Sequence, residues 1–162
     1  MVELIFVEPY KKQMTTKYYY QMLQQLKIKQ RQEQTWRNQV VTSLEALRDA
    51  LTVTLGVEHL SYHDGQRRYV ELQTPFGRPF HVSADDVIER VGLTPVVRAR
   101  IAVALESELG IETYSCAIRA RCYGSVVEYK VVGHKTKWTS VPGTMVRDIL
   151  RDLMGQLRNE KY

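Results

Sequence analysis

The sequence predicts an α+β domain, in which an antiparallel sheet of two hairpin or meander units packs against helices, preceded by an N-terminal helical arm. Its 162 residues are 44% apolar and 25% charged, which is typical of an ordinary globular domain. Apolar residues recur at helical spacing near both ends and alternate with polar residues in the middle. We expect the arm to cover residues 1–39 and one domain to cover residues 40–162, in the order α-β-β-β-α-β-β-α.

The arm begins with residues 2–8, an apolar run that predicts a short buried strand ended by Pro9. A helix that Thr15 or Thr16 can cap follows. Residues 27–39 hold few large apolar side chains and form either a solvated helix or a linker. If the arm helix docks on a protein partner or on a second copy of the chain, its anchors are Tyr19, Met22, Leu23, Leu26 and Trp36.

The domain opens with a helix that runs from about Val40 to the stop residue Gly56. Thr42 and Glu45 have the spacing of a capping box near its start. Its buried stripe is predicted to comprise Val40, Leu44, Leu47 and Leu51.

Three antiparallel strands are predicted next, over residues 57–63, 66–73 and about 78–82. Asp64-Gly65 suits the positive φ angles of a hairpin turn between the first two strands. Residues 74–77 contain a proline and a glycine and provide the turn into the third.

Two short helices are predicted between residues 83 and 110. Ser83 caps the first helix and Gly92 ends it. Thr94-Pro95 begins the second, and Gly110 stops it. The apolar stripe of the second helix is predicted to be Val97, Ile101 and Leu105.

A second hairpin is predicted where apolar and polar residues alternate over residues 114–122. A turn at Gly124-Ser125 folds this strand onto the next one and places Cys122 opposite Val127. The apolar faces of the two strands then coincide, which favours this register.

The C-terminal helix is predicted from Met145 to Leu157, with an ion pair between Asp148 and Arg151 on its polar side. The element order from about Val40 onward resembles that of type III secretion chaperones. The likeness is one of topology. Those proteins are usually acidic and lack a basic arm, so no residue role is carried over from them.

Positive charge is concentrated in the arm. Of the net charge of +5, residues 11–40 carry +6 and the remaining chain −1. The segment also holds eight glutamines and several aromatic rings, which suits phosphate contacts, hydrogen bonds and base stacking. The alternative is that the rings anchor a core or interface and the cations form a solvated face. The candidate nucleic-acid contacts in the arm are Lys11, Lys12, Lys17, Tyr18, Lys27, Lys29, Arg31 and Arg37.

A second basic group lies on the predicted hairpin and the loop after it, beside Trp138. The register places Arg121 opposite Glu128 but Arg119 opposite Lys130, and like charges directly opposite each other destabilise a sheet. Either an anion neutralises this pair or Glu128, diagonal to Arg119, screens it. The candidate contacts are Arg119, Arg121, Lys130, Lys135 and Lys137.

No catalytic motif is present. The nine glycines form no phosphate-binding loop, and the four histidines and two cysteines lack metal-ligand spacing, so we expect no metal and no cofactor. Cys116 and Cys122 face inward on one strand, too far apart to bond to each other, which favours a reducing compartment. Glu71 with Gln73 only weakly matches the strand of an acidic nuclease.

The sequence therefore predicts a non-enzymatic, cytoplasmic, nucleic-acid-binding component of a larger assembly, with DNA and RNA not distinguished. The alternative is a protein-interaction module, such as an assembly factor or structural subunit. No run of apolar residues reaches the roughly 18 that a membrane span needs, so no membrane partner is expected.

Overall fold

The computed structural model describes residues 9–58, 60, 68–80, 88–91, 94–133 and 137–159, with side chains from Thr16 onward in the first helix. The chain divides into two compact units, Met1–Arg37 and Asn38–Tyr162. The elements, in chain order, are α1 (Pro9–Leu55), β1 (Val70–Gln73), β2 (Ile88–Val91), β3 (Thr94–Ser107), β4 (Gly110–Tyr123), β5 (Val126–Val131) and α2 (Pro142–Asn159).

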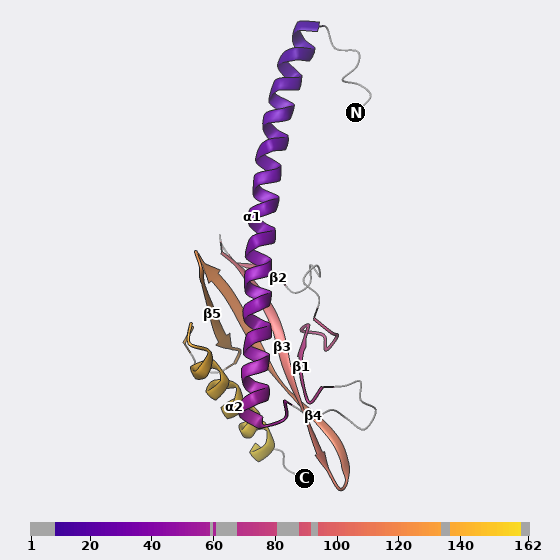
Figure 1. The fold of residues 1–162 in the computed structure, drawn as a ribbon, viewed down its shortest axis with the longest axis vertical. Helices are drawn as coiled ribbons and strands as arrows, with labels where there is room; N and C mark the ends of the chain where they lie inside the picture. The colour runs from indigo at the N-terminus through magenta and orange to yellow at the C-terminus, as the bar shows by residue number, and fades with distance from the viewer. Residues whose placement is uncertain are drawn as a thin grey trace. The chain divides into compact units, whose positions relative to one another are not determined.

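The five strands form one antiparallel sheet in the order β1-β3-β4-β5 (Figure 1). β2 pairs with the first residues of β3, and β1 pairs with residues 100–103 of the same strand. The long strands β3 and β4 are joined by a tight turn at Gly110, whose φ of +131° suits only glycine. β3 thus pairs with three of the other four strands, β1, β2 and β4.

Helices cover the inner face of the sheet. The Tyr129 hydroxyl, on this face, donates a 3.2 Å hydrogen bond to the Ser43 carbonyl of α1. From α2, the Gln156 side chain donates to the Ser115 carbonyl of β4 at 2.8 Å. Residues at most 1% exposed from both helices and the sheet form the core: Val40, Leu44, Leu47, Leu51, Val70, Ile101, Cys116, Ile118, Ala120, Val131, Met145 and Ile149.

Several sequence predictions are confirmed. The architecture is α+β, with helices packed on an antiparallel sheet. The β4–β5 register is the predicted one, with Cys122 opposite Val127 and Arg119 opposite Lys130. The first helix ends at Leu55, before Gly56, which has a φ of +70°. The C-terminal helix forms, and it buries Met145, Val146, Ile149 and Leu153.

The two helices predicted between residues 83 and 110 are wrong. The described part of this region forms β2 and β3. The apolar positions Val97, Ile101 and Leu105 are four apart, and residues four apart share a face in a strand as well as in a helix. Strand pairing on both edges of β3 favoured the period of two. The resemblance to type III secretion chaperones depended on these helices and loses its basis.

Three other expectations need correction. α1 starts at Pro9, which suits the first turn of a helix, and it runs without a break through residues 27–39 and past Thr42. Residues 57 and 58 are not in a strand, and near residues 78–82 only an isolated bridge between Gln73 and Pro79 forms among the described residues. The predicted strand 2–8 and the turn at 64–65 lie outside the described residues.

Two further expectations are confirmed. The turn over residues 74–77 forms, and Gly77 donates its N–H to the Thr74 carbonyl at 3.0 Å. Asp148 and Arg151 lie 4.0 Å apart as an i,i+3 pair.

Among the described residues, no helix is both long and apolar enough to cross a membrane.

Candidate nucleic-acid interface

The outer face of the sheet, opposite the helices, carries most of its charged side chains. Because side chains alternate along a strand, the residues between the buried positions of β3, β4 and β5 point outward together. The charged outward residues in this part of the sheet are Glu71, Glu89, Arg98, Arg100, Arg119, Arg121, Glu128 and Lys130.

Three of these cations stand directly opposite one another on adjacent strands. Arg98 of β3 is the partner of Arg119 in β4, and Arg119 is the partner of Lys130 in β5. Adjacent strands lie about 4.8 Å apart, so like charges in this arrangement repel and destabilise the sheet. We call Arg98, Arg119 and Lys130 the cation row.

The carboxylates near the cation row neutralise it in part. The Arg119 Nη2 atom lies 3.5 Å from Oε2 of Glu89, in a pair whose side chains are 41% and 33% exposed. The Arg119 Nε atom is buried and has no hydrogen-bond partner among the described residues. Lys130 forms no ion pair or hydrogen bond with the described residues. The carboxylate paired with Arg119 is therefore Glu89 on β2, whereas screening by Glu128, the group that the sequence suggested, stays a prediction.

Glu128 is bonded to Arg121, which confirms the cross-strand pair that the predicted register places there. The Arg121 Nε atom donates to Glu128 Oε1 at 3.2 Å, and its guanidinium carbon lies 4.0 Å from the Trp138 ring centroid and 4.8 Å from that of Tyr123. Cation–π contacts of this kind attract the guanidinium to the faces of the two rings. Arg121 is thus held in a cross-strand pair and against two rings, and its phosphate contact stays a prediction.

An apolar patch adjoins this arrangement at the end of the hairpin. Tyr123 is 50% exposed and stands opposite Val126, which is 49% exposed. Backbone hydrogen bonds of 2.8 and 2.9 Å between Thr139 and Tyr129 hold the neighbouring Trp138 beside β5. We call Tyr123, Val126 and Trp138 the aromatic ledge.

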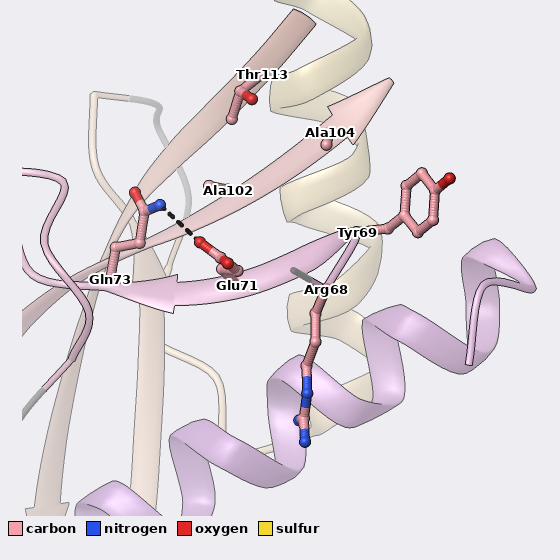
Figure 2. A pocket seen from close by; sticks show the side chains of 7 residues that line it. All are labelled: Arg68, Tyr69, Glu71, Gln73, Ala102, Ala104 and Thr113. Atoms are coloured by element: carbon pink, nitrogen blue, oxygen red, sulfur yellow. Dashed lines mark hydrogen bonds between the residues drawn. The ribbon is translucent and has the colours of Figure 1, made fainter. Parts of the chain in front are cut away.

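A shallow hollow of about 210 Å³ lies on the same outer face, toward β1 (Figure 2). It forms where β3 and β4 carry the small residues Ala102, Ala104 and Thr113. Glu71 and Gln73 lie side by side on β1, joined by a 3.2 Å hydrogen bond from the Gln73 amide. Its lining offers one carboxylate, and no group of three or more potential metal ligands occurs among the described residues.

The predicted arm residues lie on α1. The described cations Lys17, Lys27, Lys29 and Arg31 are exposed, and Tyr18 is 60% exposed. Lys27 and Arg31 are four residues apart and share a side of the helix, whereas Lys29 lies on the other side. Arg37 is bonded to Glu33 at 3.2 Å. The arm cations therefore do not form one surface, and the side chains of Lys11 and Lys12 are outside the described residues.

The predicted partner-binding residues also lie on α1. Met22 is 71% exposed and Leu26 is 48% exposed, whereas Tyr19, Leu23 and Trp36 are partly exposed. Lys137 is exposed beside Trp138, and Lys135 is outside the described residues.

Sequence reasoning missed Arg98 and Arg100, because it placed them on a helix. The signal was present: the triplet Arg-Ala-Arg occurs at residues 98–100 and again at 119–121, each within an alternating apolar pattern. Two such triplets on antiparallel neighbours can bring their arginines to one face.

No protein-family model, curated protein or solved structure matches this chain. Any inference about function therefore depends on the residues and their geometry.

Proposed function

We propose that this chain is a non-enzymatic nucleic-acid-binding component of a larger assembly. In this proposal the outer face of the sheet contacts backbone phosphates, and the exposed lysines and arginine of the arm add further contacts. The observation that supports it most strongly is the cation row of Arg98, Arg119 and Lys130, in register across three adjacent strands.

Repulsion between the like charges of the cation row lowers the stability of the sheet. Each directly opposed like-charge pair disfavours the sheet by about 0.2–1 kcal/mol, and the row contains two such pairs. A polyanion relieves this repulsion when phosphates lie against the row. Guanidinium groups also bind phosphate oxygens with paired hydrogen bonds, and the phosphates release their condensed counterions on binding. A row that destabilises the free protein thereby favours the complex.

The proposal includes a reducing, cytoplasmic setting and no cofactor. Both cysteines, Cys116 and Cys122, are buried and free. Burial raises the pKa of the Cys116 thiol, an effect that the nearby Asp152 carboxylate strengthens, so the reactive thiolate is disfavoured. A buried thiol of this kind suits a structural role better than nucleophilic catalysis.

Fluorescence anisotropy with labelled oligonucleotides tests the proposal. We expect affinity to fall steeply between about 50 and about 200 mM salt. The double variant Arg98→Gln/Lys130→Gln is expected to lower the slope of log K against log salt by about two. The matched control is Arg147→Gln/Arg158→Gln, which removes two exposed cations from α2. Absence of binding at low salt, or equal slopes for both double variants, would contradict the proposal.

A second candidate function is a protein-interaction module, which the exposed apolar side chains of the arm helix favour. Met22 and Leu26 are one helical turn apart and stand largely in solvent. Light scattering of the full chain with Met22→Gln/Leu26→Gln tests this candidate, with Val53→Gln, at a 62% exposed position, as the control. A lower molecular mass with unchanged oligonucleotide affinity would favour it over nucleic-acid binding.

A further inference from the structure

The outer face combines two chemically different features along β4. The cation row passes through Arg119, and the aromatic ledge begins at Tyr123. These two residues point to the same side and are four positions apart, or about 13 Å along a strand. Between them lies Arg121, whose charge Glu128 already balances. A ligand that spans the face therefore meets positive charge at one end and an apolar ring at the other.

Contacts with Arg121 restrict the two rings of the ledge before any ligand binds. The guanidinium of Arg121 contacts both Tyr123 and Trp138, and its own side chain is only 24% exposed. Ordering a ring costs conformational entropy, so a ring that is already fixed loses less on binding. Half of the Tyr123 surface still faces solvent. The ledge thus offers a partly fixed aromatic surface for stacking.

This geometry points to single-stranded nucleic acid as the ligand of the outer face. We propose that a base stacks on the exposed side of Tyr123, next to Trp138, while backbone phosphates lie against the cation row. The inference deepens the proposed function and depends on it. In a duplex the bases are paired and stacked on each other, so only phosphates and groove edges reach a flat surface. An unpaired strand offers both its phosphates and the faces of its bases.

A comparison of strand types tests the inference. Anisotropy is measured on the full chain with an oligothymidylate and an oligouridylate of about 16 nucleotides, and with a duplex of the same length. We expect the single strands to bind about tenfold more tightly than the duplex at equal salt, since one stacked base contributes a factor of that order. The two single strands distinguish DNA from RNA.

Substitution of the ring separates stacking from charge. Tyr123→Ala is expected to weaken single-strand binding about tenfold and to leave duplex binding unchanged, whereas Tyr123→Phe keeps both. The control is Phe76→Ala, which removes a 70% exposed ring from the turn at residues 74–77. Thermal unfolding of each variant confirms that the fold is retained.

A spectroscopic readout reports on the ledge directly. The chain has two tryptophans, so a Trp36→Phe background leaves Trp138 as the fluorophore. We expect the single strands to quench the fluorescence of Trp138. We expect this quenching to be lost in Tyr123→Ala. If single strands and duplex bind equally and Tyr123→Ala changes neither, the inference is overturned and the proposed function stands. If neither form binds at low salt, both are overturned.

Discussion

Reversal of the charge at Lys130 is expected to stabilise the protein and weaken nucleic-acid binding at the same time. Lys130 faces Arg119 across the β4–β5 pair, so Lys130→Glu replaces a like-charge contact with an opposite-charge contact. Glu128, on the same face, is occupied by Arg121, which leaves Arg119 as the partner of the new carboxylate. Removing a repulsion and adding an attraction, each worth about 0.2–1 kcal/mol, stabilises the fold by about 1 kcal/mol.

Chemical and thermal denaturation measure the stability change. About 1 kcal/mol corresponds to a rise of about 2–4 °C in Tm for a chain of this size. Anisotropy in the same buffer is expected to show weaker oligonucleotide binding with a shallower salt dependence. Arg147→Glu, on the exposed side of α2, makes the same change in net charge as a control. A lower Tm for Lys130→Glu, or binding that matches that of Arg147→Glu, would refute the reasoning about the cation row.

Three further predictions concern the stability of the fold. Ile101→Ala, at a fully buried position of β3, should lower the free energy of unfolding by about 2–5 kcal/mol in urea titrations, and Leu105→Ala, at a 42% exposed position, by far less. Gly110→Ala should destabilise the fold by about 1–3 kcal/mol because of the positive φ there. Gly155→Ala in α2, where an added Cβ meets no atom within 4 Å, should stabilise it by about 0.5–1 kcal/mol. Differential scanning calorimetry distinguishes the two signs. Burial raises the pKa of Cys116 above its ordinary value of 9.0, so the unfolded chain releases this proton at a lower pH than the folded chain. The free energy of unfolding should then fall as pH rises above about 9, and less steeply in Cys116→Ala; an equal slope in both proteins would exclude this thiol as the cause.

The C-terminal part of the fold follows from local sequence patterns. The alternation over residues 114–122 and the turn at Gly124-Ser125 together determine the register of the β4–β5 hairpin. A one-residue slip would turn every buried residue of β4 to solvent. The apolar residues of α2 are equally specific. Met145, Val146, Ile149 and Leu153 recur every three or four residues, which fits a helix and does not fit the alternation of a strand. Opposition of Arg119 and Lys130 was therefore predictable from the sequence.

The rest of the candidate site was not predictable in the same way. The pattern of β3 fits both a helix and a strand, and only its pairing with three other strands, β1, β2 and β4, decides between them. Arg98 enters the cation row, and Glu89 reaches Arg119, as consequences of that pairing. The contact of Arg121 with Trp138 likewise depends on the return of the chain beside β5.

The pairing of β3, β4 and β5 also bears on how the protein folds. These strands follow one another in sequence, and tight turns at Gly110 and Gly124 join them, so closing each loop costs little chain entropy. In contrast, the contact between Ser43 and Tyr129 joins residues 86 positions apart. We expect the three-stranded meander to assemble early and the helix from residue 38 onward to dock after it, so that substitutions at the helix–sheet contact accelerate unfolding more than they slow folding.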